Sequence, residues 1–453
     1  MSILKNIFSK QKRINNFSET VAGFTKKQAQ EEALRCPQPT SHVQAQRCPL
    51  GVDVFSFIRS LREGDTVGAL QKIREQNPLP GICGRVCSAP CQSKLGDEQA
   101  WSVDIRSLER FAYDQGDKRA GAAPAAKRKE KIAIVGSGPA GLVCAHELAK
   151  VGFGVTIFEA LHLPGGVLRY AIPEFRLPKK ILDAEITHLQ SFGVEIKTNC
   201  FIGQTISILE LFEMGFSAVY LATGSGVPQG FGITGESLKG VYWMSEFLMS
   251  LNLSTAKPHD PSNDIFHSGK KVAVLGSGTI ALDCARAALR LGKDVVFVYE
   301  RSEDELLALR QDINFAKEEG IRFEFFARAL EILGDGHNHA RGVKCVRVDF
   351  ADVDSSGKWQ LKEVEGSEFM IDADHVIVSG KHQPNSIIAK FTNGLKTNPN
   401  ETFVTNNDHF ETSIPGVFAG GDCAMGAGPL ITAMASAKKV AMEIDRYLQD
   451  LVK

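Results

Sequence analysis

Several classes of protein are excluded by what the sequence lacks. Its 453 residues contain no apolar run near the ~18 residues that cross a bilayer, so an integral membrane protein is not expected. The 52 basic and 53 acidic side chains leave a net charge of −1, which gives no overall field for nucleic acid. A content of 43% hydrophobic and 23% charged residues excludes a disordered or collagen-like chain. What remains is an ordinary globular chain, long enough for about three domains.

Cysteine is also scarce, since ten residues in 453 are too few for a disulfide scaffold. The N-terminal run MSILKNIFSKQKR lacks the long apolar core and cleavage site of a secretory signal, and we expect residues 1–30 to form a basic arm. These observations predict a cytoplasmic, reducing location, where clustered cysteines more often mean metal or redox chemistry than disulfides. Half of the cysteines fall within one fifth of the chain: Cys36, Cys48, Cys83, Cys87 and Cys91.

Three blocks of the chain differ in hydrophobic period. Residues 31–118 carry apolar side chains at helical spacing, for example over 54–58 and 69–73, which predicts an α-helical domain. Residues 119–130 are small, basic and aperiodic, as in a linker. From residue 131, short apolar runs alternate with helical segments, which predicts an α/β fold of βαβ units and parallel sheets. The expected strands are 131–135, 155–158, 219–222, 271–275, 295–299 and 375–378.

The first strand–turn–helix opening carries a glycine pattern that binds a dinucleotide pyrophosphate. Gly136, Gly138 and Gly141 directly follow strand 131–135 and precede a helical segment. Glycine there permits the tight turn and lets the backbone approach the pyrophosphate, whose charge then lies at the N-terminus of the helix. Farther on, Glu159 ends the next strand, where a carboxylate accepts hydrogen bonds from a ribose. Because strand, turn, helix and acid are in register, a chance glycine turn is disfavoured.

A second opening of the same kind begins at residue 271. Gly276, Gly278 and Ala281 follow the strand, with alanine in the third place that the pattern permits. The next strand ends at Glu300, which would accept the free 2′-hydroxyl of NAD and repel the 2′-phosphate of NADP.

Two arginines near Glu300 give the opposite signal. Arg301 and Arg310 could hold a 2′-phosphate, and Glu300 could equally well begin an ordinary polar loop. The choice between NADH and NADPH therefore stays open, with NADH favoured.

Two dinucleotide sites in one chain predict a flavoprotein that passes hydride from a nicotinamide to a flavin, with the protein stacking the two rings. Residues 222–224 follow a strand where such proteins return between domains, and Asp422 ends a late strand beside the flavin's ribityl or pyrophosphate region. No Cys-x4-Cys follows the first unit and no Cys-x2-Cys lies in the second, which disfavours a disulfide reductase. We expect three isolated cysteines to pack as small apolar side chains: Cys144, Cys284 and Cys423.

The cysteine-rich block fits a metal site of either of two kinds. A Cys-x3-Cys-x3-Cys run at 83–91 has helical spacing, but its internal glycine and proline make one continuous helix unexpected. Iron–sulfur clusters use several thiolates brought together by short spacings, often beside proline, and Cys48 precedes a proline. A zinc site with four ligands would satisfy the spacing equally well.

Longer runs resemble one known family over nearly the whole chain. They are NPLPGICGRVC (77–87), LERF (108–111), PGGVLRYAIPEFRLP (164–178) and PGVFAGGD (415–422). On these runs the sequence resembles the small (beta) subunit of bacterial glutamate synthase and the flavin and iron–sulfur portion of dihydropyrimidine dehydrogenase. The resemblance implies an α-helical iron–sulfur domain with two 4Fe-4S clusters, followed by two Rossmann-like dinucleotide-binding domains. We place the FAD domain at 131–268 and 378–453 and the NAD(P)H domain at 269–377.

The resemblance implies different outcomes for the two clusters. One ligand set maps to Cys36, Pro39, Gln44 and Leu95, of which only Cys36 bears a thiol, so that cluster is expected to be absent. The other set, three cysteines with a Glu or Gln, is complete: Cys48, Cys87, Cys91 and Glu109. We therefore predict one 4Fe-4S cluster, the alternative being a cluster-free relic in which these cysteines only pack.

The resemblance also implies which residues contact each nucleotide. FAD contacts carry over to Gly136, Gly138, Pro139, Gly141, Glu159, Gly166, Leu168, Arg176 and Asp422. Contacts to the nicotinamide nucleotide carry over to Gly276, Gly278, Thr279, Ala281, Arg301 and Arg310. The family usually has a basic residue where Glu300 stands, which leaves its NADPH preference open for this chain. Hydride transfer requires no acid–base side chain, so no residue is predicted to be catalytic.

The implied function is an FAD-dependent NAD(P)H:acceptor oxidoreductase that supplies electrons to a larger partner. By resemblance that partner is of the glutamate synthase large-subunit type, which reduces an imine formed from 2-oxoglutarate and ammonia. One alternative is the NADH-oxidising subunit of a dihydropyrimidine dehydrogenase. Another is a stand-alone, cluster-free flavin reductase, which the loss of one ligand set favours. A non-catalytic binding module is disfavoured by the intact glycines of both turns.

Overall fold

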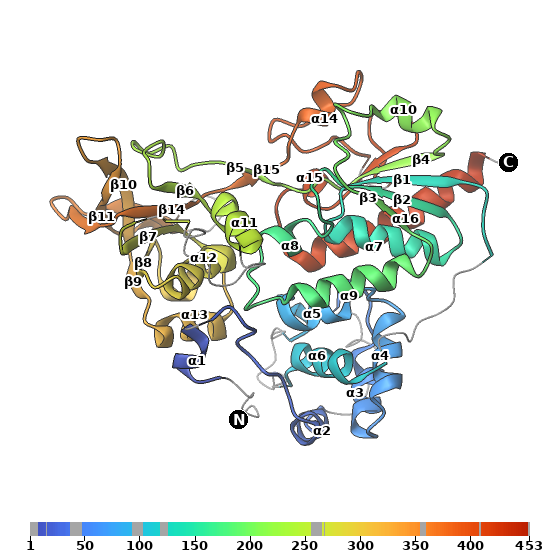
Figure 1. Cartoon of the computed structure of the whole chain (residues 1–453), viewed down its shortest axis with the longest axis horizontal. Coiled ribbons are helices and arrows are strands. Elements are labelled where there is room, and N and C mark those ends of the chain that lie inside the picture. Colours follow the sequence, from blue (N-terminus) through green and yellow to red (C-terminus); the bar gives the residue numbers. More distant parts are fainter. Residues whose placement is uncertain are drawn as a thin grey trace.

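The structure is a computed structural model of the chain. It describes residues 8–14, 16–36, 48–92, 103–117, 126–254, 265–266, 268–353, 359–406 and 409–451. Within these ranges no helix combines the length and the apolar character that a membrane span requires. The molecule has two lobes, each built on a parallel sheet, with a helical layer beneath one of them (Figure 1).

The N-terminal part of the described chain is helical, as its period predicts. Three of its helices begin at an aspartate whose side chain accepts an N–H of the first turn: Asp53, Asp65 and Asp104. Its elements are α1 (Lys10–Ile14), α2 (Lys26–Leu34), α3 (Val54–Arg62), α4 (Thr66–Arg74), α5 (Pro80–Val86), η2 (Pro90–Gln92) and α6 (Ile105–Gln115). Because α5 ends at Val86 and η2 begins at Pro90, the cysteine run 83–91 is not one continuous helix, as expected.

The first sheet has the strand order β16-β4-β1-β2-β3, with all pairs parallel. Its strands are β1 (Lys131–Val135), β2 (Gly154–Phe158), β3 (Glu195–Lys197), β4 (Ala218–Leu221) and β16 (Val417–Ala419). On one side lie α7 (Pro139–Lys150), α8 (Val167–Tyr170), α9 (Lys179–Gln190) and α16 (Leu430–Leu451). On the other side lie α10 (Ile208–Glu213) and α14 (Ile387–Lys390) (Figure 1).

The second sheet has the order β6-β14-β7-β8-β9, also parallel throughout. Its strands are β6 (Val241–Trp243), β7 (Lys271–Gly276), β8 (Asp294–Tyr299), β9 (Arg322–Phe325) and β14 (His375–Ser379). Three helices cover one face: α11 (Met244–Ser254), α12 (Gly278–Arg290) and α13 (Arg310–Glu319). An antiparallel sheet covers the other face: β10 (Ala327–Gly334), β11 (Ala340–Val353), β12 (Trp359–Glu363) and β13 (Phe369–Asp372).

Period-two alternation explains how β7 serves both layers. Val272 and Val274 belong to the apolar cluster beneath the helices, whereas Ala273 and Leu275 belong to the cluster beneath the antiparallel sheet. Successive side chains of a strand point to opposite faces, so an uninterrupted apolar run is needed when both faces are covered. The predicted α/β class with two Rossmann-like units behind a helical part is confirmed.

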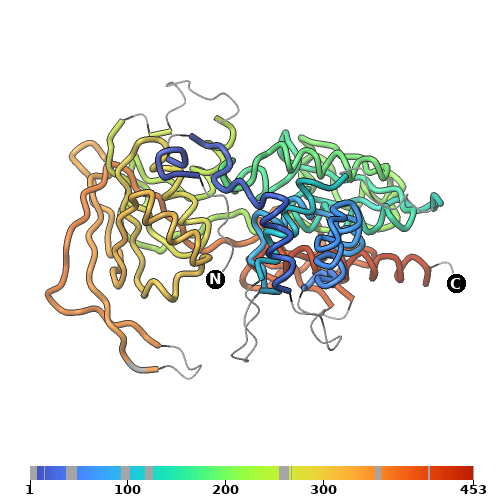
Figure 2. The backbone as a smooth tube through the Cα atoms, turned by 90° about the horizontal axis from the view of Figure 1, so that it is seen from below, coloured from blue at the N-terminus to red at the C-terminus, as the bar shows by residue number. Residues whose placement is uncertain are grey.

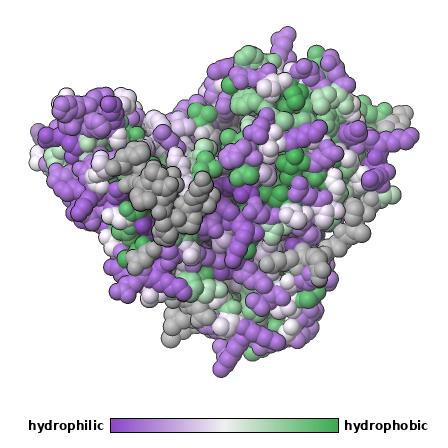
Figure 3. Space-filling view, in the orientation of Figure 1, coloured by the Kyte–Doolittle hydropathy of each residue, from purple (hydrophilic) through white to green (hydrophobic). Residues whose placement is uncertain are grey.

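The division between the two lobes differs from the one drawn on the sequence. β6 and α11 lie before residue 268, yet β6 pairs with β14 in the second sheet. The chain crosses between lobes at β5 (Val227–Pro228), which pairs with β15 (His382–Gln383) on the return. Because β6 has only three residues, its apolar run is too short to reveal its sheet. Figure 3 shows a notch between the lobes on the side of this crossing.

The helical part and the first lobe share one apolar core. That core joins Phe57 and Leu108 of the helical part to Leu142 of α7 and to Met434 of α16. In Figure 2 the N-terminal segment runs from the second lobe across to this helical part. The helical part is therefore held firmly against the first lobe, and the second lobe has apolar clusters of its own.

A close contact between α5 and α6 gives the first testable prediction. A Cβ atom at Gly84 of α5 would lie 2.6 Å from the Cα of Arg110 on α6. Gly84→Ala should therefore force the two helices apart and lower the free energy of unfolding of this part by about 1–3 kcal/mol. Hydrogen exchange of α5 and α6 amides measures the loss. Gly336→Ala, which adds a Cβ with no described atom within 4 Å, is the control; equal exchange in both variants would contradict the packing argument.

Candidate functional site

The three glycines of the first turn have three different structural roles. Gly136 has φ +105°, and a Cβ there would lie 2.5 Å from the carbonyl oxygen of Ala222. A Cβ at Gly141 would lie 2.0 Å from the Gly136 carbonyl, where α7 packs on the turn. Gly138, at the N-cap of α7, differs because no described atom lies within 4 Å of its Cβ position. An open position over a helix N-terminus is what an approaching pyrophosphate needs.

Glu159 holds the first turn in place. It is 6% exposed, and its Oε2 accepts hydrogen bonds from the backbone N–H of Ser137, at 3.0 Å, and from the Ser137 hydroxyl. Its Oε1 accepts the N–H of Leu161 at 2.9 Å. A ribose bound here would meet a carboxylate already oriented by backbone donors. The predicted ribose contact stays a prediction.

The loop that contains Gly166 and Leu168 lies against the same turn. The N–H of Gly165 donates to the Ser137 hydroxyl at 2.9 Å, and a Cβ at Gly166 would lie 2.8 Å from the Cα of Gly138. Leu168 is fully buried. The structure thus brings the predicted contacts Pro139, Gly166 and Leu168 together around one turn, although they lie up to 29 residues apart in sequence.

Asp422 closes this arrangement at the carboxyl edge of the first sheet. It is the first residue of α15 (Asp422–Met425), directly after the return of β16. Its backbone carbonyl accepts the hydroxyl of Ser225, which follows β4, at 3.1 Å. Burial raises the pKa of Asp422 to about 6, against a backbone N–H from Gly428 that lowers it. The ends of β1, β4 and β16 therefore converge, as the ligand site of a parallel sheet requires.

The second turn repeats the pattern at the end of β7. Gly276 has φ +154°, and a Cβ there would lie 2.6 Å from the Cβ of Ser379 on β14. Gly278 begins α12 with φ +85°, and Ala281 is fully buried in the same helix. The hydroxyl of Thr279 donates to the carbonyl of Leu307 at 3.4 Å, so the loop that follows β8 lies beside this turn.

The side chains predicted to read the second ribose all have ion-pair partners. Glu300 pairs with Arg328 at 2.9 Å, and Arg301 pairs with Glu305 at 2.9 Å. Arg310 binds two carboxylates in the loop after β8. Sequence reasoning missed Arg328, which stands on β10 of the antiparallel sheet, because nothing in the local pattern links it to Glu300.

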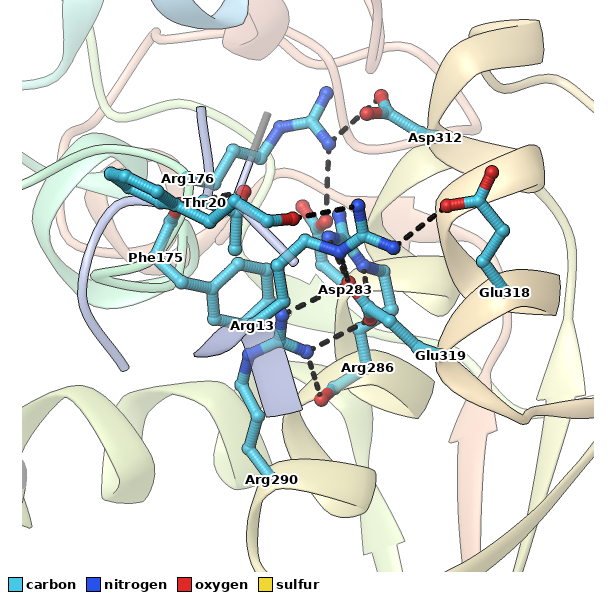
Figure 4. Close-up of polar contacts among 11 residues, drawn as sticks. Arg13, Thr20, Phe175, Arg176, Asp283, Arg286, Arg290, Asp312, Glu318 and Glu319 are labelled. Atoms are coloured by element: carbon cyan, nitrogen blue, oxygen red, sulfur yellow. Dashed lines mark hydrogen bonds and ion pairs between the residues drawn. The ribbon is translucent and has the colours of Figure 1, made fainter. Parts of the chain in front are cut away.

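Arg176, predicted to contact FAD, joins the two lobes. Its Nη1 lies 3.1 Å from Oδ1 of Asp283 on α12 and 3.0 Å from Oδ2 of Asp312 on α13 (Figure 4). Burial alone would raise the pKa of Asp312, but Arg176 and Arg286 lower it. The described geometry shows a bridge between lobes, and the FAD contact stays a prediction.

A second buried cluster reinforces this bridge. Glu319 of α13 is contacted by Arg286 at 2.8 and 2.9 Å, by Arg290 at 3.1 Å and by Arg13 of α1 at 3.3 Å. Phe175, beside Arg176, lies under the guanidinium of Arg290, 4.1 Å from ring centre to Cζ (Figure 4). The N-terminal segment, the loop of the first lobe and the helices of the second lobe thus meet at one buried, charged junction.

The predicted cluster ligands lie at the edge of the shared apolar core: Cys87 is buried in it, and Cys48 and Cys91 are partly buried and pack against it. The Sγ of Cys87 accepts the N–H of Ala89 at 3.3 Å, and burial raises the pKa of Cys48 although backbone N–H groups of residues 50–52 lower it. Cys91 and Glu109 interact electrostatically with both thiols. Asn77 donates to Oε1 of Glu109 at 2.7 Å. Of the other predicted set, Cys36 is buried, whereas Pro39, Gln44 and Leu95 lie outside the described residues.

Burial raises the pKa values of the four predicted cluster ligands. Burial, with the charges of Glu109 and Cys48 adding to it, raises the pKa of Cys87 to about 11. Burial likewise raises the pKa of Cys91 well above its usual value and that of Glu109 to about 8. At neutral pH these thiols are therefore protonated when nothing is bound, and a metal centre would deprotonate the thiols that ligate it. Within the described ranges no group of three or more His, Cys, Asp or Glu side chains is placed to hold a metal ion.

Sequence reasoning left out one neighbour of these thiols. Cys83 is fully buried, and the charges of Glu109, Cys87 and Cys48 add to the burial that raises its pKa. Its Sγ contacts the sulfur of Met434 on α16 at 3.7 Å. The three cysteines expected to pack as small apolar side chains do so, because Cys144, Cys284 and Cys423 are fully buried.

Comparison with known proteins supports both parts of the chain. Residues 130–439 match the pyridine nucleotide-disulphide oxidoreductase family, and residues 13–120 match the dihydropyrimidine dehydrogenase domain II, 4Fe-4S cluster family. The NADPH-type glutamate synthase small chain of Escherichia coli is 31% identical over 96% of this chain and 94% of its own length. The chain belongs to the glutamate synthase small-chain family of pyridine nucleotide-disulphide oxidoreductases. The family suggested by the sequence runs is thereby confirmed.

Other relatives are longer than this chain. The NADP-dependent formate dehydrogenase subunit beta of Moorella thermoacetica is 34% identical over 89% of this chain and 59% of its own length. The NADPH-Fe(3+) oxidoreductase subunit beta of Geobacter sulfurreducens is 33% identical over 89% of this chain and 63% of its length. The chain thus spans about three fifths of these two curated relatives. FprA of Mycobacterium tuberculosis has the same fold, with a TM-score of 0.60 over 72% of this chain, 86% of its own and 20% identity.

The cofactors of this small-chain family member are FAD, NAD(P)H and a 4Fe-4S cluster, as its two family matches indicate. The open position at Gly138 fits the first, the second glycine turn fits the nicotinamide nucleotide, and the three thiols with Glu109 have the donor chemistry that the cluster requires. The assignment of individual residues to each cofactor stays a prediction.

The open position at Gly138 separates cofactor binding from folding. Gly138→Ala should leave the melting temperature of the flavin-free protein unchanged, yet lower its affinity for FAD at least about tenfold, because the new Cβ occupies the pyrophosphate approach. Fluorescence titration of apoprotein with FAD measures the loss. In contrast, Gly141→Ala should lower both properties, because its Cβ collides with the protein itself. Unchanged FAD affinity in Gly138→Ala would contradict the assignment of this turn.

Glu319 gives a prediction about acid stability. Burial opposes its ionisation, but Arg286 and Arg290 lower the pKa of Glu319 to about 2. The folded state therefore binds this proton less readily than the unfolded state, and the stabilisation present above about pH 4.3 is lost as the pH falls toward 2. Glu319→Gln should cost about 3–5 kcal/mol at neutral pH, because it leaves buried guanidinium groups uncompensated.

The neighbouring residue Glu318 provides a matched control for this experiment. It also pairs with Arg13, at 2.7 Å, but its side chain is 59% exposed. Glu318→Gln should cost at most about 1 kcal/mol. Urea unfolding between pH 3 and pH 7 compares the two variants, and equal losses would show that burial does not set the strength of these pairs.

Proposed function

We propose that this chain is the electron-input subunit of a larger oxidoreductase and that it oxidises NAD(P)H. When bound, FAD accepts hydride and releases electrons singly, and a 4Fe-4S cluster carries single electrons. The observation that carries the proposal is the sharing of one apolar core between the first lobe and the helical part with its buried thiols. This shared core fixes the thiols relative to the first glycine turn.

The chain's own residues have three tasks in this proposal. Gly138 and the N-terminus of α7 bind the flavin pyrophosphate, with Glu159 orienting the ribose. The turn at Gly278 binds the nicotinamide nucleotide at the N-terminus of α12. Cys48, Cys87, Cys91 and Glu109 would hold the cluster, and the backbone N–H groups of residues 50–52 partly offset the burial that raises the pKa of Cys48.

We assign the partner as a larger subunit of the glutamate synthase large-subunit type. The relatives named above are small or beta subunits of multi-subunit oxidoreductases, and the E. coli small chain matches nearly its whole length. An imine formed from 2-oxoglutarate and ammonia would then be the final acceptor. A dihydropyrimidine dehydrogenase subunit is the second possibility, which the domain II match supports.

A different function follows if the thiols only pack. The loss of cysteine at Pro39, Gln44 and Leu95 favours a stand-alone flavin reductase that reduces diffusible acceptors. The two functions differ in metal content, so one measurement separates them.

Cofactor content tests this proposal. Anaerobically purified protein should contain about four irons and four sulfides per flavin. Cys87→Ser should lose most of the iron but keep the flavin, and it should still reduce a diffusible dye with NADH or NADPH. Cys200→Ser, which removes a partly exposed thiol bonded to the Thr198 carbonyl, is the control and should keep its iron.

Three results would contradict it. Flavin without iron would favour the stand-alone reductase, and about eight irons would contradict the ligand assignment. Full iron in Cys87→Ser but not in Cys83→Ser would transfer the ligand role to Cys83.

A further inference from the structure

The inference concerns the ribose edge of the second nucleotide site, so it rests on the proposed oxidation of NAD(P)H. Glu300 follows the last residue of β8, beside the glycine turn of β7. The loop after β8 touches that turn through the contact between Thr279 and Leu307. A nucleotide whose pyrophosphate lies on α12 therefore places its adenosine ribose against this loop.

Only one oxygen of Glu300 is engaged. Its Oε2 accepts Nε of Arg328 at 2.9 Å, whereas Oε1 has no hydrogen-bond partner among the described residues. The Glu300 side chain is 43% exposed. Arg328 is itself held from behind, because its Nη1 lies 3.4 Å from Oε1 of Glu363 on β12. Glu363 thus holds Arg328, and Arg328 holds the Glu300 carboxylate in an orientation that leaves Oε1 free.

The cations that could bind a 2′-phosphate are already engaged. Arg301 donates to Oε1 of Glu305 at 2.9 Å and to the Trp359 carbonyl at 3.2 Å. Arg310 donates to Oε1 of Glu303 at 3.0 Å and also contacts Asp304. A 2′-phosphate would have to displace these carboxylates before it could pair with either arginine.

The balance of charges at the ribose edge also disfavours a 2′-phosphate. Among the described residues, five carboxylates lie there, at positions 300, 303, 304, 305 and 363, together with the three guanidinium groups of Arg301, Arg310 and Arg328. Lys317, which contacts Glu303, brings the cations to four. Counted over the described residues, the edge keeps a net negative charge, which repels the roughly −1.5 to −2 charge of a phosphate monoester.

We infer that Glu300, oriented by Arg328, makes this chain select NADH over NADPH by accepting the 2′-hydroxyl of the adenosine ribose on its free oxygen. Arg328 is then a positioning residue for specificity. It lies on the antiparallel sheet, outside the Rossmann unit that carries the rest of the site. The opposite role, in which Arg328 leaves Glu300 and binds a 2′-phosphate, makes different predictions for the same variants.

Binding of nucleotide fragments to the FAD-loaded full-length chain tests the inference without any turnover. Calorimetry compares ADP-ribose with 2′-phospho-ADP-ribose in the wild type, Glu300→Gln, Glu300→Arg and Arg328→Gln. The wild type should prefer ADP-ribose, and Glu300→Gln should reduce this preference about tenfold, the size expected for one hydrogen bond to a charged group. Glu300→Arg should reverse it, and the ratio of NADPH to NADH use in flavin reduction should rise in parallel.

Arg328→Gln distinguishes the two roles of the arginine. If Arg328 orients Glu300, this variant binds ADP-ribose several-fold more weakly and binds the 2′-phosphate form no worse than the wild type. Weaker binding of the 2′-phosphate form would overturn the inference and assign Arg328 to the phosphate. Glu368→Gln removes a carboxylate that pairs with Lys344 at 3.4 Å elsewhere in the same lobe, and it should leave the preference unchanged.

Two further outcomes are decisive. Tighter binding of 2′-phospho-ADP-ribose by the wild type, or an unmoved ratio in Glu300→Gln, would overturn the inference while leaving NAD(P)H oxidation intact. Failure of every variant to bind either fragment would overturn the proposed function itself, and the inference with it.

Discussion

The buried charge junction between the lobes constrains how the two nucleotide-binding lobes are placed relative to each other. Arg176 reaches from the first lobe to Asp283 and Asp312 of the second, and Arg13 of the N-terminal segment reaches Glu319. Removing such charges from water is costly, so they persist only where every partner is in place. The junction therefore admits few relative positions of the two lobes. Hydride transfer needs the two nucleotide sites at a defined separation, and this network provides that restraint.

The parts predicted from sequence are those that local chemistry determines. Six apolar runs became strands because period-two alternation and burial act within a few residues, and the glycines of both turns except Gly138 are required by positive φ or by contacts under 3 Å. Contacts between segments far apart in the chain have no comparable local pattern in the sequence. Arg328 meets Glu300 only because an antiparallel sheet folds over the second lobe, and β6 joins the second sheet across more than 130 residues. Side-chain partners of this kind require the tertiary structure.

The cysteine-rich block was predicted in part from local spacing and in part depends on contacts between distant segments. The family resemblance implies that Cys48, Cys87, Cys91 and Glu109 act together, and in the structure Cys87 lies in the shared apolar core with Cys48 and Cys91 packed against it. Their role as ligands stays a prediction. Cys83 was passed over because spacing does not say which cysteines of a run face inward. The helical part carries these thiols on helices that pack into the core of the first lobe. An electron carrier held there would keep a fixed distance from the first turn whatever the second lobe does.

At the ribose edge, a glutamate at position 300 in place of a basic residue changes which ion pairs the neighbouring arginines can form. With a basic residue at position 300, Arg301 and Arg310 would extend a cationic surface, and the carboxylates of the loop would serve only to orient it. With Glu300 in that place, Arg301 and Arg310 pair with carboxylates of the loop after β8. Arg328 pairs with Glu300 and orients its carboxylate. Relatives named for NADPH therefore do not decide the nucleotide used here. The choice between NADH and NADPH at this edge depends on which charged group still has an atom free to bind the ribose. In the described part of this site, that atom is Oε1 of Glu300, because Oε2 is bonded to Arg328.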